Sequence, residues 1–150
     1  MSWRAITEDD LLLSISGAEL EALRAAVLAS GQDDPVANSI IRTVDEVRGY
    51  IAACDRNELG EGDTMPEKLI RPAVDVIILD IMGRAGGTMI DESGYRRDRA
   101  KDARRLFERV ADCKYAIEAP AVVDSEKIGG PTPSFTGRAK HFSRTDQDGI

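Results

Sequence analysis

The sequence predicts an all-α protein, a compact bundle of about five helices followed by an extended C-terminal tail. Apolar residues recur every three or four positions through most of residues 8–114, which is typical of amphipathic helices. Capping residues or prolines open several of these periodic stretches, and glycines follow some of them. The periodicity stops near residue 120, so we expect a helical domain at 1–119 and a tail at 120–150.

The first two helices are predicted from their start signals. The stretches 7–10 and 16–19 each place a hydroxyl residue three positions before an acid, a pattern typical of a capped helix start. We therefore expect a short helix around residues 11–13. A second helix should run to Gly31, because glycine is a natural helix stop.

The third and fourth helices have the clearest patterns. Asp34 and Pro35 provide a cap and a first helical residue, and the apolar stripe that follows ends around Cys54. Pro66 opens the fourth helix, whose apolar content places it at the centre of the bundle, with a slight kink expected at Pro72.

The fifth helix, expected from about Glu92 to Lys114, is strongly basic. Residues 96–114 hold eight basic and four acidic side chains. Three interpretations remain open: a solvated face with internal salt bridges, a subunit or partner interface through Arg97 and Arg104, or direct contact with DNA. The residues expected to face inward are Ala100, Ala103, Phe107 and Val110.

Composition limits the class of protein. The 150 residues suit one domain, and a net charge of −7 argues against binding nucleic acid with the whole surface. No apolar run is long enough to span a membrane, and the N-terminus lacks the pattern of a signal peptide, so we expect synthesis in the cytosol. In that compartment Cys54 and Cys113 are expected to be reduced thiols and not a disulfide.

Two loops resemble ligand-binding motifs without completing them. Residues 55–67 begin like an EF-hand loop, but Leu59 and Pro66 stand where that loop needs oxygen ligands, so we interpret this stretch as a mobile loop. The glycine-rich stretch 83–87 follows a helix and lacks a phosphate-binding lysine, so it is interpreted as a helix-ending turn.

No arrangement of polar residues predicts catalysis. His141 is the single histidine and has no identifiable ligand or triad partners. Asp75 and Asp80 are expected to mark a solvated face of the fourth helix, the alternative being an arginine partner across the bundle or a subunit boundary. We therefore predict neither an enzyme nor a bound metal or cofactor.

The tail is unusual for a disordered terminus because it keeps its aromatic residues. Residues 129–144 combine prolines, two phenylalanines and three basic residues with no acid. Such a segment can become ordered on a neighbouring surface, and the alternative is a floppy terminus. We expect it to belong structurally to another subunit, through five candidate contact residues: Phe135, Arg138, Lys140, Phe142 and Arg144.

Five segments, taken in order, resemble one protein family. They are WRAITEDDLLLSISGAELEAL (3–23), DPVANSIIRTVDEVRGYIAA (34–53), MPEKLIRPAVDVIILDIMGR (65–84), YRRDRAKDARRLFERVADCKYAI (95–117) and HFSRTDQDGI (141–150). Together they are similar to the Mu-like head–tail connector (neck adaptor) family of tailed phages and prophages, which are small helical proteins.

The resemblance implies a structural protein of the virion, made in the bacterial cytoplasm. It implies a homo-oligomeric ring between the portal protein and the next neck or tail protein, with DNA passing through the channel without sequence-specific binding. The alternative is a small helical regulatory or adaptor protein that binds nucleic acid or a partner through its basic last helix.

Overall fold

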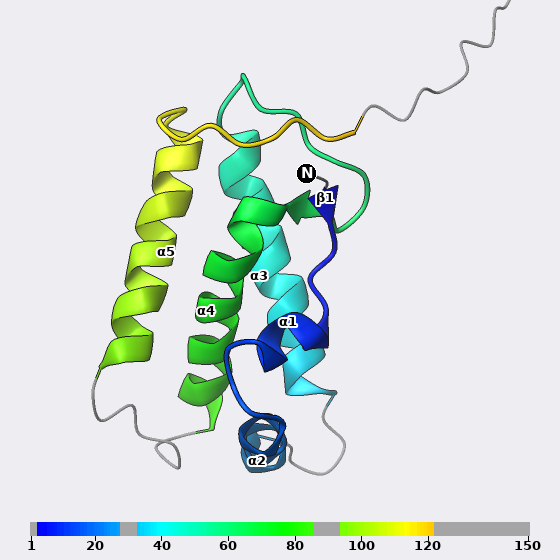
Figure 1. Ribbon diagram of the computed structural model, residues 1–150, viewed down its shortest axis with the longest axis vertical. Helices are drawn as coiled ribbons and strands as arrows, with labels where there is room; N and C mark the ends of the chain where they lie inside the picture. Colours follow the sequence, from blue (N-terminus) through cyan, green and yellow to red (C-terminus); the bar gives the residue numbers. More distant parts are fainter. Residues whose placement is uncertain (1–2, 28–32, 86–93, 122–150) are drawn as a thin grey trace, which may run out of the picture.

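The computed structural model describes residues 3–27, 33–85 and 94–121, and within these it is an all-α protein, as predicted (Figure 1). The described elements are β1 (Trp3–Arg4), α1 (Glu8–Leu12), α2 (Gly17–Val27), α3 (Pro35–Ala52), β2 (Met65–Pro66), α4 (Glu67–Arg84) and α5 (Tyr95–Ala111). None of the helices in this part of the chain is long and apolar enough to cross a membrane.

Helix α4 is the centre of the bundle, as its composition predicts. It packs against α3 on one side and α5 on another, while α1 and α2 also contact it (Figure 1). Leu69, Ile77 and Ile81 of α4 are completely buried, together with Phe107 of α5. Pro72 lies within the first part of the helix.

The predicted capping residues Thr7, Ser16 and Asp34 are confirmed, although the first helix spans Glu8–Leu12 and not residues 11–13. The Thr7 amide and hydroxyl both donate to the Asp10 carboxylate, and the Ser16 hydroxyl accepts from the Glu19 amide at 3.2 Å. The Asp34 carboxylate accepts from the Val36 amide at 3.0 Å ahead of α3. These bonds satisfy amides that a helix start leaves without partners.

Some predicted boundaries differ or lie outside the described residues. The expected end of the second helix at Gly31 and the expected start of the fifth at Glu92 both fall in undescribed stretches. The fifth helix ends at Ala111 rather than Lys114. Gly83, expected in a turn, is still helical in α4. The residues predicted to face inward from α5 are all buried: Ala100, Ala103, Phe107 and Val110.

A two-stranded antiparallel pairing joins the start of the chain to the entry of α4. Trp3 pairs with Pro66, and Arg4 pairs with Met65. The sequence pattern did not predict it, because strands of two residues are too short to show alternation. The pairing fixes Arg4 beside the first turn of α4.

The loop between α3 and α4 is tethered, which corrects its interpretation as mobile. Arg48 of α3 donates hydrogen bonds to the Thr64 carbonyl at 2.6 Å and to the Gly60 carbonyl at 3.1 Å. The Trp3 ring lies directly against Gly60, where it leaves no room for a side chain. A guanidinium that binds backbone carbonyls is a tertiary contact, and loop composition carries no sign of it.

The prediction of reduced cysteines is also wrong, because Cys54 and Cys113 form a disulfide with their Cα atoms 5.4 Å apart. Each cysteine lies two residues beyond the C-terminal end of its helix, and these ends of α3 and α5 lie at the same end of the molecule (Figure 1). The prediction rested on the expected compartment alone, whereas the parallel course of these two helices brings the thiols together.

Cys113 occupies a helix-end position that usually holds glycine. Its φ is 59°, in the left-handed region, and its amide donates to the Val110 carbonyl at 3.0 Å. The Lys114 amide donates to the Arg109 carbonyl at 2.8 Å. These two bonds are those of a Schellman motif, in which glycine is preferred at the left-handed residue. The left-handed backbone conformation is therefore energetically unfavourable for a cysteine at this position, but it is the position from which Cys113 reaches Cys54.

Candidate functional site

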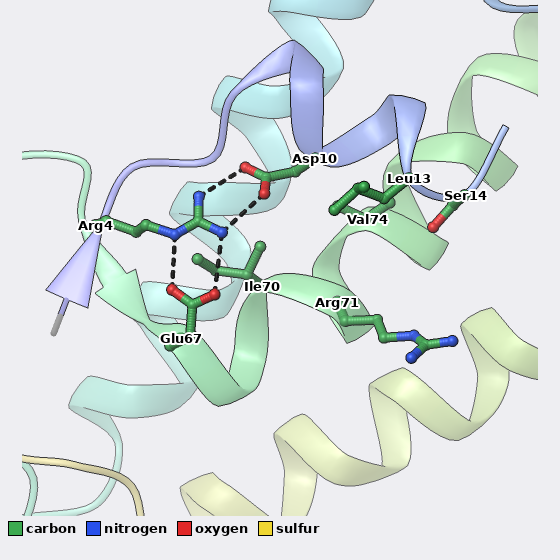
Figure 2. A pocket seen from close by; sticks show the side chains of 8 residues that line it. All are labelled: Arg4, Asp10, Leu13, Ser14, Glu67, Ile70, Arg71 and Val74. Atoms are coloured by element: carbon green, nitrogen blue, oxygen red, sulfur yellow. Dashed lines mark hydrogen bonds and ion pairs between the residues drawn. The ribbon is translucent and has the colours of Figure 1, made fainter. Parts of the chain in front are cut away.

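A cluster of one arginine and two carboxylates joins β1, α1 and α4 (Figure 2). The Arg4 guanidinium donates two hydrogen bonds to Asp10, both at 2.8 Å, and two to Glu67, at 2.6 and 3.1 Å. The hydrogen bond from Arg4 is the main cause that lowers the pKa of Asp10 to about 2. The hydrogen bond to Asp10, and after it the one to Glu67, raises the pKa of Arg4. The cluster holds the N-terminal segment against the central helix.

Beside this cluster a groove runs over α4 between α1 and α5. It consists of three adjoining hollows of about 230, 260 and 310 Å³ that share lining residues. Apolar side chains of α4 line it, from Ile70 past Val74 to Ile78. We call this feature the α4 groove.

Two apolar residues stand exposed where the groove is lined. Leu13, just after α1, is 87% exposed, and Tyr95, at the start of α5, is 58% exposed. Burial of such an exposed leucine against another molecule would be favourable. Sequence reasoning identified neither residue, because each lies at the end of a helix, where the apolar periodicity does not show which side is exposed.

Arg71 lies where the three hollows meet, because it lines all of them. Among the described residues its side chain has no hydrogen bond or ion pair. Figure 2 shows it directed away from the Arg4 cluster and toward α5. The signal in the sequence was an arginine inside the most apolar helix, just before Pro72.

Asp75 and Asp80 both have partners across the bundle, which was the alternative to a solvated face. Asp75 pairs with Arg99 of α5 at 3.0 Å and its side chain is only 14% exposed. Asp80 accepts a hydrogen bond from the buried Ser39 hydroxyl at 2.7 Å, with Arg42 at 3.9 Å. The pKa of Arg99 is raised, chiefly by a hydrogen bond with Tyr95 and also by Asp75.

Four of the basic residues of α5 form ion pairs with carboxylates of the described chain. The ion pairs are Arg96–Glu19 at 2.7 Å, Arg99–Asp75 at 3.0 Å, Arg104–Glu46 at 3.8 Å, Arg105–Asp102 at 3.4 Å and, just beyond the helix, Lys114–Asp112 at 2.8 Å. Three of these pairs join α5 to other helices, and the Arg105–Asp102 pair lies within α5.

The predicted interface residues divide into two groups. Arg97 and Arg104 are on the exposed side of α5, and neither lines the α4 groove. The other five lie outside the described residues: Phe135, Arg138, Lys140, Phe142 and Arg144.

The chemistry of the groove suits binding to a protein surface. Four carboxylates line the groove and each accepts from a guanidinium: Asp10 and Glu67 from Arg4, Asp75 from Arg99 and Asp102 from Arg105. Arg71 remains as a cation without a partner in this part of the chain. Among the described residues, no group of three or more histidine, cysteine or acidic side chains could hold a metal ion.

Comparisons with models of known protein families, with curated proteins and with solved structures found no match to this chain.

Proposed function

We propose that the chain is a structural subunit of a tailed-phage or prophage head–tail connector, assembling as a ring between the portal and the tail. The observation that supports this is the ordered resemblance of five segments to the Mu-like connector family. These segments cover residues 3–23, 34–53, 65–84, 95–117 and 141–150. The location in the virion, the portal and tail partners and the non-enzymatic role belong to the same proposal.

The described body is compatible with this role. It is a small helical unit whose groove wall is held by ion pairs, and it has exposed apolar residues beside that groove. Subunit contacts could therefore add considerably to the stability of a modest core. Contacts of head-to-tail type close into a ring when the rotation between subunits permits it.

The competing function, nucleic-acid binding through α5, receives less support. A helix that binds nucleic-acid phosphates needs unpaired cationic side chains that can replace the counterions of the phosphates. Arg96, Arg99 and Arg105 instead have carboxylate partners in the same chain. A DNA titration at two salt concentrations separates the proposals: strongly salt-dependent binding would favour the competitor.

Negative-stain microscopy and sedimentation of the purified full-length chain test the connector proposal. We expect closed rings at high concentration, or on addition of the portal protein encoded in the same gene cluster. A subunit that forms rings only when the portal protein is present is also compatible with the proposal. A single-subunit particle at every concentration, with and without the portal, would contradict it, as would a gene neighbourhood without virion genes.

A further inference from the structure

We propose that, in the ring, an outer ridge of α3 from one subunit packs into the α4 groove of the next, with Asp45 of the first facing Arg71 of the second. This inference rests on the proposed function, since it requires copies of the chain to assemble. It names the two surfaces that meet and the charged pair that sets their register.

The ridge consists of Ile41, Asp45 and Gly49, which follow each other at intervals of four. Residues spaced in this way form a continuous row along a helix surface. Ile41 is 58% exposed although it is a large apolar residue. Asp45 is exposed, and among the described residues its side chain has no hydrogen bond or ion pair.

Gly49 leaves room on the ridge for another surface to approach. A glycine inside a helix destabilises it by roughly 0.5–1 kcal/mol relative to alanine. Packing within the chain does not explain it, because a Cβ placed on Gly49 would meet nothing within 4 Å. A close approach by the backbone or side chains of a neighbour would account for the absence of a side chain.

The ridge and the groove lie on different sides of the body. The α3 residues that pack against the core are on the opposite face of the helix from Asp45, so the ridge points away from α4. The groove opens between α1 and α5, on the side of α4 where α1 lies, and α3 runs behind α4 in the view of Figure 1. Different surfaces on two sides give a head-to-tail contact, which can propagate into a ring.

The two surfaces are complementary in shape, a ridge and a groove, and in charge. A helix ridge fits a groove of this kind, and Ile41 would pack against Leu13, the exposed apolar residue at the edge of the groove. Arg71 and Asp45 each lack a described partner within the chain, so a pair between them would not break an existing interaction. A charged pair of this type sets register and excludes wrong alignments more than it adds affinity.

Charge reversal in the full-length chain tests the pairing. We expect R71E and D45R each to raise the concentration needed for half-assembly at least about tenfold, a change equivalent to about 1.4 kcal/mol per contact. The double variant R71E/D45R carries the same pair in reverse and should recover most of that loss. R109E and E58R are matched controls, because they make the same charge changes at exposed residues away from both surfaces.

A steric variant tests the ridge independently of charge. Gly49→Phe should leave the circular dichroism of the dilute subunit unchanged, since the space around it is open, and should abolish ring formation. Rings that form normally with G49F, or a double charge variant that assembles no better than the single ones, would overturn the inference while leaving the connector proposal intact. Failure of the unmodified chain to assemble under any condition would overturn both.

Discussion

Single residues in this protein connect segments that are far apart in sequence. Arg4 binds two carboxylates on α1 and α4, and Arg48 binds two carbonyls of the loop between α3 and α4. The Trp3 indole donates to the Glu118 carbonyl at 2.8 Å, so the beginning and the end of the described body touch. At this scale each prediction concerns the change in folding stability when one such contact is altered.

Asp10→Asn should make the protein less stable near neutral pH and change its response to acid. Because the folded-state pKa of Asp10 is lowered to about 2 from 3.8, its ionised form stabilises the fold above about pH 4. That contribution is lost as the pH falls toward 2. We expect a deficit of about 1–2 kcal/mol at pH 6 that is mostly lost by pH 2, measured by urea unfolding.

Asp9→Asn is the control for this experiment, because Asp9 is an exposed residue of the same helix turn. It should follow the acid profile of the unmodified protein. A deficit for D10N that stays constant from pH 6 to pH 2 would show that the ion pair with Arg4 is not its source.

Gly60→Ala should destabilise the fold by about 1–3 kcal/mol, because the added methyl group overpacks the site. A Cβ at this position would lie 2.5 Å from a Trp3 ring carbon and 2.8 Å from the Thr64 hydroxyl oxygen. Gly83→Ala is the matched control. It lies in α4 with open space around it and should be neutral or slightly stabilising. Thermal unfolding measures both, and equal melting temperatures for the two variants would contradict the packing argument.

Ion pairs and a disulfide add links at the ends of the helices. Arg24 of α2 pairs with Glu8 of α1 at 2.9 Å and with Asp34, the cap of α3, at 3.2 Å, so one guanidinium joins three elements. At the other end of the bundle, the disulfide joins the second residue after α3 to the second residue after α5. Arg56 adds a hydrogen bond to the Cys113 carbonyl at 3.2 Å.

Removing the disulfide should reduce the stability of the fold by about 2–4 kcal/mol, because the cross-link closes a long loop in the unfolded chain. The linked residues are 59 positions apart. The variant C54S/C113S should unfold at lower urea concentration than the oxidised protein, and a reducing agent should bring the unmodified chain to the same level. No effect of the reducing agent would contradict this.

The variant C54S/C113G separates the cross-link from the helix end. Glycine adopts the left-handed conformation of residue 113 at no steric cost, so this variant should exceed C54S/C113S in stability by about 1 kcal/mol. The comparison uses the same urea unfolding measurement. A glycine variant no more stable than the serine variant would show that the backbone cost at residue 113 is negligible.

At the scale of the whole molecule, the body and the tail have separate tasks in our proposal. The buried hydrophobic residues of the described body lie between Ile6 and Val110. Deleting residues 129–150 should therefore leave the helical circular dichroism and the melting temperature of the body unchanged. If the deletion unfolds the body, the tail is part of the same subunit's core.

The same deletion should abolish ring formation if the tail completes a neighbouring subunit. The full-length variant F135A/F142A is the matched test, because it keeps the chain length and charge and removes only the two proposed aromatic anchors. Sedimentation at increasing concentration measures both. Normal assembly of the deleted chain would contradict the proposed role of the tail.

Patterns that depend on neighbours in sequence predicted the fold well. The helix starts after Thr7, Ser16 and Asp34 and the inward face of α5 follow from local hydrogen bonds and helical periodicity. The groove was not predictable in this way. Its lining comes from α1, α4 and α5, and a single exposed residue such as Leu13 has no distinctive sequence signal.

The sequence by itself determined the helical class, the central place of α4 and the resemblance on which the connector proposal rests. Only the tertiary structure decided the Cys54–Cys113 disulfide, the partners of Asp75 and Asp80 and the tethering of the loop by Arg48. The physical reason is range: capping and periodicity act within a few residues, whereas these contacts require the relative positions of whole helices, which the packing of the core sets.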